Sequence, residues 1–304
     1  MQFKPLLILI GATASGKTRF AIELAKRLNA EIISADSRQV YKRMDIGTGK
    51  DLDEYLKNHV PYHLIDILEP GTKYHVDAFK KDFYAVYNQL QAQNKMIILC
   101  GGTALYINSL IQPSELTSIP INPIIRSQFE NQSLPHCIAE LKKFPTESWK
   151  NVDFKSHKRV IRALEIAHYL KDNPIPTADY PKLNPIFFGL VDEVETRRLK
   201  IKKRLQMRLK DGLIEEVKGL MEAGLSFEML EYYGLEYKFI GKYLKGELSY
   251  TEMEAQLYHG ICQYAKRQMT FFRKMDREGA QINWIDASLN LEKQVEVVSK
   301  LIKA

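Results

Sequence analysis

The residues best suited to chemistry form one glycine-rich segment near the amino terminus. Positions 11 to 18 read Gly-Ala-Thr-Ala-Ser-Gly-Lys-Thr and match the pattern G-x-x-x-x-G-K-T, which binds phosphate groups. The glycines let backbone N–H groups turn inward around an anion, the lysine adds a positive charge, and the last threonine can bind Mg²⁺. We therefore expect a diphosphate or longer phosphate chain at Gly11, Ala12, Thr13, Ala14, Ser15, Gly16, Lys17 and Thr18, with Mg²⁺ at Thr18.

The segments on either side of this motif have the patterns of a strand and a helix. Leu6 to Ile10 is a continuous apolar run that ends at a glycine, which predicts a buried strand. In residues 19–28 the apolar side chains recur at near-helical spacing. A strand before and a helix after are the context that the phosphate-binding pattern requires, so a glycine turn without function is disfavoured.

A second candidate for chemistry is Asp36, which follows a strand pattern at Glu31 to Ala35. Ligands of open α/β sheets bind beyond the carboxyl ends of the strands, so Asp36 is expected at the same edge as the phosphate-binding segment. An acid at this position could equally cap the next segment. Position alone leaves both interpretations open.

The rest of the chain predicts an α/β fold with a P-loop NTPase-like core. Strand patterns at Tyr62 to Leu68, Met96 to Leu99 and Ile186 to Val191 alternate with helical patterns, which favours a parallel β-sheet flanked by helices. Prolines surround an amphipathic helix pattern at Lys155 to Leu170. We therefore expect a catalytic core of residues 1–112 and 185–304, and a mainly helical insertion domain of residues 113–184.

Composition narrows the class of protein. The 304 residues are 45% hydrophobic and include no run as long as a membrane span, so we expect a globular core and no membrane association. The residues before Pro5 lack the pattern of a signal peptide, and the three cysteines form no CxxC pair, which fits a cytoplasmic location. The net charge of +7 is compatible with a polyanionic partner, although the basic run at 197–210 is by itself typical of a solvated helix face.

The sequence lacks a metal-binding acid after the strand at 96–99, and this absence indicates the type of phosphate chemistry. An NTP hydrolase carries a metal-binding acid at the end of a buried strand, whereas the strand at 96–99 leads into Cys-Gly-Gly-Thr. The acid expected at this edge, Asp36, is better placed to accept a proton than to hold a metal ion. The pattern favours a diphosphate that acts as a leaving group, with Asp36 as the general base.

Seven segments together resemble the tRNA dimethylallyltransferase (tRNA isopentenyltransferase) family. Each segment is weak evidence alone, but their shared order across most of the chain is specific to this family. The segments are GATASGKT from Gly11, DSRQVYKRMDIGTGK from Asp36, HLIDILEP from His63, GGTALYI from Gly101, RVIRALE from Arg159, DGLIEEV from Asp211 and YAKRQMTFFR from Tyr264.

The resemblance implies a reaction and its partners. A dimethylallyl group would pass from dimethylallyl diphosphate to N6 of the adenosine next to the anticodon on its 3′ side, in tRNAs that read codons beginning with U. The target base would leave the stack of the anticodon stem-loop to react. Mg²⁺ would assist at the diphosphate, and we expect a cytoplasmic monomer.

The resemblance also implies roles for individual residues. Asp36 matches the general base, while Lys17, Thr13, Thr18 and Arg204 match positions on the diphosphate side. The catalytic set is therefore Asp36, Thr18, Lys17 and Arg204. Contacts with tRNA are implied for Asp36, Ser37, Arg38, Gln39, Thr103, Arg126, Arg159 and Arg162.

Five positions, at three places in the chain, depart from the family's pattern. Lys155-Ser156 stands where Asn-Asp is common, and Ile261-Cys262 stands where Thr-Arg is common. These two departures replace hydrogen-bonding groups on the tRNA side. Arg208 occupies a position where methionine is usual.

Two classes of alternative remain at this point. One is a P-loop kinase that uses ATP, or a prenyltransferase that acts on free adenine nucleotides. The other is a tRNA-binding protein without catalytic activity, which the presence of Lys17, Thr18 and Asp36 argues against. Labelled dimethylallyl diphosphate offered with tRNA or with AMP separates the transferases.

Overall fold

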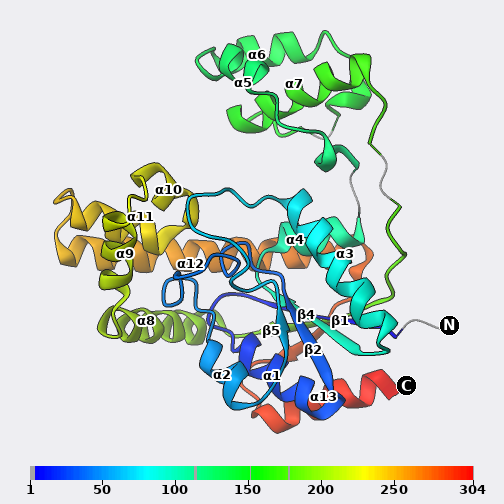
Figure 1. Ribbon diagram of the computed structural model, residues 1–304, viewed down its shortest axis with the longest axis vertical. Coiled ribbons are helices and arrows are strands. Elements are labelled where there is room, and N and C mark those ends of the chain that lie inside the picture. The colour runs from blue at the N-terminus through cyan, green and yellow to red at the C-terminus, as the bar shows by residue number, and fades with distance from the viewer. Residues whose placement is uncertain (1–3, 113–114, 151, 177–178, 304) are drawn as a thin grey trace. The chain divides into compact units, whose positions relative to one another are not determined.

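The computed structural model describes residues 4–112, 115–150, 152–176 and 179–303 and divides the chain into two compact units (Figure 1). The core unit comprises Met1–Gln112 and Lys182–Ala304, and the insertion unit comprises Pro113–Pro181. The sequence places the second boundary between the units after residue 184, whereas the structure places it after Pro181. Residues 1–3, 113 and 114 lie outside the described part of the chain. The phosphate-binding segment and Asp36 both belong to the core unit.

The described core unit contains a six-stranded sheet with the order β3-β2-β4-β1-β5-β6, and every neighbouring pair is parallel. The strands are β1 (Leu6–Gly11), β2 (Ala30–Ser34), β3 (Tyr62–His63), β4 (Met96–Gly101), β5 (Pro185–Val191) and β6 (Asn283–Asp286). In the centre, Ile8 pairs with Leu99 on β4 and with Phe187 on β5. The predicted parallel α/β core is confirmed, and the carboxyl ends of its strands share one edge.

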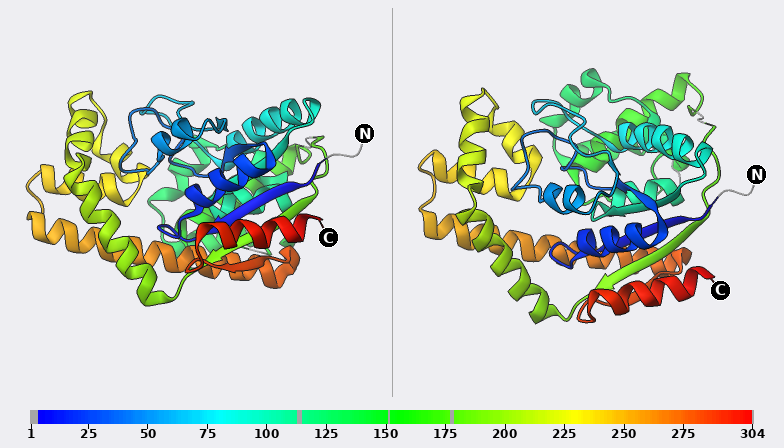
Figure 2. Two further views of the ribbon diagram at one scale, coloured as in Figure 1. Left: turned by 90° about the horizontal axis from the view of Figure 1, so that it is seen from below. Right: turned by 60° about the horizontal axis from the view of Figure 1, so that its bottom comes forward.

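Helices cover both faces of the sheet, which explains why the central strands are apolar without alternation. All six residues of β1 are buried. Helices α1 (Lys17–Leu28) and α13 (Leu291–Lys303) contact each other and pack into one apolar cluster with the sheet (Figure 2). Helix α12 (Tyr250–Met275) contacts β1 and α4 (Ala104–Ile111) on the opposite face.

The remaining helices complete the two units. Those of the core unit are α2 (Leu52–Lys57), α3 (Val76–Ala92), α8 (Val194–Lys210), α9 (Leu213–Glu222), α10 (Phe227–Tyr233) and α11 (Leu235–Leu244), followed by a π-helical turn at Asp276–Ala280. Those of the insertion unit are α5 (Pro123–Glu130), α6 (Leu134–Leu141) and α7 (His157–Asp172), with 3₁₀ turns at Glu115–Ser118 and Thr146–Ser148. The described part of the chain has no helix with both the length and the apolar composition that crossing a membrane requires.

The insertion unit is mainly helical, as predicted, and has a small core of its own. Buried side chains of α5, α6 and α7 meet there, including Phe129, Leu141 and Leu164. Helix α7 begins at His157 rather than at Lys155, because the N–H of Lys155 donates to Oδ1 of Asp153 at 3.0 Å in a turn.

The predicted third strand at Tyr62 to Leu68 is mostly wrong, because β3 contains only Tyr62–His63. Leu64 and Asp66 have φ angles of 60° and 56°, which lie in the left-handed region and cannot continue a strand. This turn brings the carboxylate of Asp66 to Lys50. The sequence also gave no indication of β6 or α13, which extend the sheet and cover its face.

Candidate functional site

The phosphate-binding segment forms the turn between β1 and α1. Ala14 and Gly16 adopt left-handed conformations with φ of 62° and 88°, which wind the backbone tightly ahead of the helix. The N–H groups in the first turn of α1 have no partner within the helix and carry partial positive charge. Residues 14–19, together with Asp51, Lys200 and Arg204, line a hollow of about 220 Å³. Its backbone donors and cations suit an anion.

Two side chains of this segment have N–H or O–H groups that lack hydrogen-bond partners in the described structure. Lys17 is partly buried, and its Nζ donates to the carbonyl of Ala12 at 2.7 Å. Burial and, to a smaller extent, the charge of Arg204 lower the pKa of Lys17 to about 8, against opposing contributions from Cys100, Asp36 and Asp51. The hydroxyl of Ser15 is buried without a hydrogen-bond partner in the described structure. An anionic ligand would give both groups a partner.

Asp36 follows β2 and combines both interpretations that its position allowed. Its Oδ1 accepts the N–H of Arg38 at 2.9 Å, which is a local turn bond. No hydrogen bond of the described residues uses its Oδ2. Asp36 also lines the same pocket as Lys17 and Thr18, so one carboxylate oxygen holds the loop and the other is available for chemistry.

This pocket joins the carboxyl ends of three strands to helices α8 and α12. It encloses about 80 Å³, and its lining includes the carboxylate of Asp36 as well as the cations Lys17 and Arg204. It is lined by Thr13, Lys17, Thr18, Asp36, Gln39, Thr48, Gly49, Tyr55, Cys100, Gly101, Gly102, Arg204, Tyr264 and Gln268. Burial raises the pKa of Cys100 to about 11, so this thiol is neutral and is not a nucleophile at neutral pH.

Gly101 at the end of β4 leaves no space for a side chain, and a side chain at Gly102 would displace that of Gln268. A Cβ on Gly101 would lie 2.2 Å from the carbonyl oxygen of Ala35, because the ends of β2 and β4 are in backbone contact. A Cβ on Gly102 would lie 2.4 Å from Nε2 of Gln268. The missing metal-binding acid is therefore a steric feature of the site as well as a sequence feature.

Gln268 on α12 is a site residue that the sequence analysis did not single out. Its Oε1 accepts the N–H of Thr13 at 2.9 Å, and its Nε2 donates to the carbonyl of Gly102 at 2.8 Å. One buried amide thus joins the phosphate-binding turn to the end of β4. The available signal was a polar residue within the buried stripe of α12, beside Ala265 and Met269.

A network of hydrogen bonds holds residues 37–50 against the pocket. The N–H of Ser37 donates to Oγ1 of Thr103 at 3.0 Å. Gln39 accepts from the hydroxyl of Ser34 at 2.8 Å and donates to the carbonyl of Gly49 at 3.0 Å. These bonds place Gln39 and Gly49 in the pocket wall.

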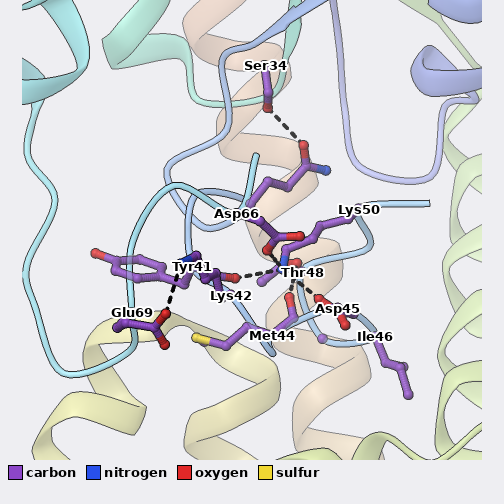
Figure 3. Close-up of polar contacts among 12 residues, drawn as sticks. Ser34, Tyr41, Lys42, Met44, Asp45, Ile46, Thr48, Lys50, Asp66 and Glu69 are labelled. Carbon is purple, nitrogen blue, oxygen red and sulfur yellow. Dashed lines mark hydrogen bonds and ion pairs between the residues drawn. The ribbon is translucent and has the colours of Figure 1, made fainter. Parts of the chain in front are cut away.

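The same segment contains a buried ammonium group. Lys50 is 1% exposed, and its Nζ contacts Oδ1 of Asp45 at 2.6 Å, the carbonyl of Tyr41 at 2.6 Å and Oδ1 of Asp66 (Figure 3). From α9, the carboxylate of Glu216 accepts the N–H groups of residues 45, 46 and 47 at 2.7, 2.7 and 3.0 Å. The segment is fixed on two sides before any ligand binds.

The residues predicted to contact tRNA fall into two sets. Asp36 to Gln39 and Thr103 belong to the core unit, where Asp36 and Gln39 line the pocket and the N–H of Ser37 donates to Thr103. The guanidinium of Arg38 lies 4.6 Å from the ring centroid of Tyr232. Arg126, Arg159 and Arg162 lie in the insertion unit. The structure therefore does not bring the whole predicted set together within one unit.

The three insertion arginines differ in their surroundings. Arg126 and Arg162 both pair with the buried carboxylate of Glu165, at 3.0 and 3.1 Å. Arg162 also donates to backbone carbonyls of residues 116, 119 and 120. Arg159 is exposed and pairs with Asp153 at 2.7 Å. Arg159 is the one of the three whose contacts leave it most accessible.

These residues could bind Mg²⁺ only with the help of phosphate oxygens and water. Among the described residues, no group of three or more His, Cys, Asp or Glu side chains could hold a metal ion. Mg²⁺ often binds through one or two protein oxygens and completes its shell with phosphate oxygens and water. The hydroxyl of Thr18 in the pocket fits that form.

Comparisons of the sequence and of the structure with known proteins indicate the same family. A family model described as IPP transferase matches residues 39–275. The tRNA dimethylallyltransferase 2 of Phocaeicola vulgatus is 44% identical over 304 residues, which cover 99% of both chains. The crystal structure of the full-length tRNA isopentenylpyrophosphate transferase of Bacillus halodurans aligns with a TM-score of 0.73 at 31% identity, over 99% of this chain and 96% of that one. A eukaryotic dimethylallyltransferase acting on tRNA aligns with a TM-score of 0.81 at 21% identity, over 99% of this chain and 80% of its own, which supports the fold alone.

Proposed function

Because the chain belongs to the IPP transferase family, we propose that it transfers a dimethylallyl group from dimethylallyl diphosphate to N6 of an adenosine in tRNA. The acceptor is the adenosine next to the anticodon on its 3′ side, in tRNAs that read codons beginning with U. The products are N6-dimethylallyladenosine in tRNA and diphosphate. The observation that carries this proposal is that Asp36, Lys17 and Thr18 line one pocket at the edge of the sheet.

The reaction exchanges one bond for another. The lone pair of N6 attacks the first carbon of the dimethylallyl group while the bond from that carbon to the diphosphate oxygen breaks. Oδ2 of Asp36 takes the proton that N6 loses, since Oδ1 is held by Arg38. The electron pair of the broken bond leaves with the diphosphate.

Positive groups of the pocket stabilise the charge that develops on the diphosphate. Lys17 and Arg204 supply full charges, and the N–H groups at the start of α1 supply hydrogen bonds. Mg²⁺ bound at Thr18 would add charge neutralisation at the leaving oxygens. Gln268 keeps the phosphate-binding turn at a fixed distance from the end of β4.

Binding of tRNA would use the residues around the pocket and the insertion unit. Ser37, Arg38 and Gln39 follow the proposed base in the chain, and Thr103 accepts the N–H of Ser37. These residues are suited to contact an extruded nucleotide. The net charge of +7 suits a polyanion, and phosphate contacts should make tRNA affinity fall steeply with salt. We propose a monomer that acts in the cytoplasm on the anticodon stem-loop.

The kinase and free-nucleotide alternatives are not favoured. A kinase needs acids that hold its metal ions, and Gly101 and Gly102 stand where such an acid would follow β4. Relatives that match along 99% of the chain carry names specific to tRNA dimethylallyl transfer.

One labelling experiment tests the proposal directly. The protein is incubated with labelled dimethylallyl diphosphate and, separately, with unmodified tRNA, with the same tRNA carrying guanosine at the target position, or with AMP. We expect label in the first tRNA only, recovered as N6-dimethylallyladenosine after digestion and mass spectrometry. Label on AMP alone would refute the tRNA assignment.

A further inference from the structure

Two arginine side chains on α8 converge on a single point in the pocket wall. Gly49 marks this point, because an ideal Cβ built on it would lie 1.6 Å from Nη2 of Arg208 and 2.1 Å from Nη2 of Arg204. The two nitrogens are therefore no more than 3.7 Å apart, the sum of these two distances. Residues 204 and 208 are one helical turn apart, which places both side chains on one face of α8.

These like charges lie close together with few partners. The Nη2 atom of Arg208 is buried and makes no hydrogen bond in the described structure. The nearest partners of its Nη1 are the carbonyl of Gly47 at 3.4 Å and the carboxylate of Glu236 at 3.8 Å, both at the limit of contact. Arg204 makes no hydrogen bond or ion pair with any described residue. A buried guanidinium without partners is costly, so the arrangement calls for an anion.

Arg208 is protonated in the free protein. Burial, followed by the neighbouring charge of Arg204, lowers the pKa of Arg208 to about 10, which still leaves it charged at neutral pH. Glu236 compensates only partly, because burial raises the pKa of this carboxyl while Arg208 lowers it. The pair therefore keeps excess positive charge.

The position of the pair indicates which anion it serves. Arg204 lines both the pocket that contains Lys17 and Thr18 and the hollow around residues 14–19, and Gly49 lines the pocket. The side chain of Arg208 is only 15% exposed, so a small anion inside the pocket is a better match than the backbone of an RNA, which stays at the surface.

Building on the function proposed above, we propose that Arg208 is a second arginine for the diphosphate, acting beside Arg204. Gly49 is part of this site, because any side chain there would displace both guanidinium groups and would strain a backbone with φ of 61°. The site binds diphosphate as substrate group and as product, and it requires no prenyl chain.

The test measures binding of inorganic pyrophosphate, so it does not depend on prenyl transfer. Isothermal titration calorimetry with Mg²⁺ at pH 7.5 compares the unmodified protein with Arg208→Met and with Arg198→Met. Arg198 is a matched control, because it lies on the same helix, is 53% exposed and pairs with Glu195 at 2.8 Å. We expect Arg208→Met to weaken pyrophosphate binding about tenfold, equivalent to about 1.4 kcal/mol, and Arg198→Met to leave it unchanged.

Further variants separate this role from a structural one. Arg208→Met leaves Glu236 unpaired, so the double variant with Glu236→Gln is measured as well, and circular dichroism checks that each protein is folded. We expect the double variant to bind pyrophosphate as weakly as Arg208→Met. Affinity equal to that of the unmodified protein in the double variant would overturn the proposal.

Two outcomes distinguish this inference from the proposed function. Weaker pyrophosphate binding in Arg208→Met, in a protein that does not prenylate tRNA, would retain the anion site and reject the tRNA function. Unchanged pyrophosphate affinity with weakened binding of a tRNA anticodon stem-loop would overturn the inference in favour of an RNA phosphate contact.

Discussion

Residues 41–50 and the second half of α8 each bury a cation, but they supply it with partners very differently. Lys50 gives its three N–H donors to three oxygens, from Asp45, Asp66 and the backbone of Tyr41. Arg208 has five donors, one long hydrogen bond and one distant carboxylate. The saturated cation fixes the shape of a loop, whereas the unsaturated one retains binding capacity. In this chain, the number of hydrogen-bond partners therefore distinguishes a buried cation with a structural role, Lys50, from one that can bind a ligand, Arg208.

The largest expected effect concerns Asp36, whose Oδ1 has a hydrogen-bond partner while its Oδ2 has none among the described residues. Asp36→Asn keeps the oxygen that accepts the N–H of Arg38 and removes the basic one. We expect turnover to fall by about 10²- to 10⁴-fold, the usual contribution of a general base. Single-turnover prenyl transfer measures this loss, while pyrophosphate affinity and the thermal unfolding midpoint should stay unchanged. Full turnover in the variant would exclude Asp36 from proton transfer.

Removing the saturated cation should affect stability instead. Lys50→Met leaves the carboxylates of Asp45 and Asp66 without their partner, which we expect to lower the free energy of unfolding by about 2–3 kcal/mol. The value is below that for a fully buried pair, because Asp45 is 55% exposed. Urea unfolding measures the change. Lys42→Met, which loses only a surface pair with Glu69, should change stability by less than about 0.5 kcal/mol.

The lowered pKa of Lys17 predicts that the use of dimethylallyl diphosphate depends on pH. The charged ammonium binds diphosphate and exists below the pKa, so kcat/KM for dimethylallyl diphosphate should fall as the pH rises through about 8. At pH 9 the loss should be about tenfold. Lys17→Arg keeps its charge over this range and should remove this basic limb from the profile. If the limb persists in that variant, another group causes it.

The smallest expected effect tests the same rule in the insertion unit. Arg162 donates to three backbone carbonyls and to Glu165, so Arg162→Met should lower the free energy of unfolding by about 1 kcal/mol. Arg159→Met loses one exposed pair and should change stability by less than about 0.5 kcal/mol. Its effect should appear in tRNA affinity measured by filter binding. Equal loss of stability in both variants would contradict the distinction.

Local patterns predicted most of the core correctly. The apolar run of β1, the phosphate-binding motif and the start of α1 lie next to one another in sequence, so a single window contains the whole signal. β6 was missed because only one of its four residues is buried, which leaves no apolar run to detect. The excess length of the predicted third strand arose from an apolar pattern that a left-handed turn at Leu64 interrupts.

In the candidate site, too, the residues marked by a local sequence pattern were predicted and those joined by long-range contacts were not. The sequence identified Lys17, Thr18 and Asp36, which the structure brings to one pocket, from a motif and from a strand end. It did not identify Gln268 or the saturation of Lys50, because these contacts join residues that no local period relates. The roles assigned to Arg126, Arg159 and Arg162 on tRNA remain predictions.

The glycines that end β4 also bear on how far this active site could be redesigned. Installing a metal-chelating acid there, the simplest imaginable step toward a nucleotide hydrolase, would push one substituent into the peptide of Ala35 and another into the amide of Gln268. That amide in turn holds the phosphate-binding turn, so accommodating the acid would disturb the turn it was meant to serve. The backbone of Ala35 at one position and the amide of Gln268 at the other thus restrict the catalytic repertoire of the fold in this chain, and a change of chemistry at the second position would require replacing Gln268 as well.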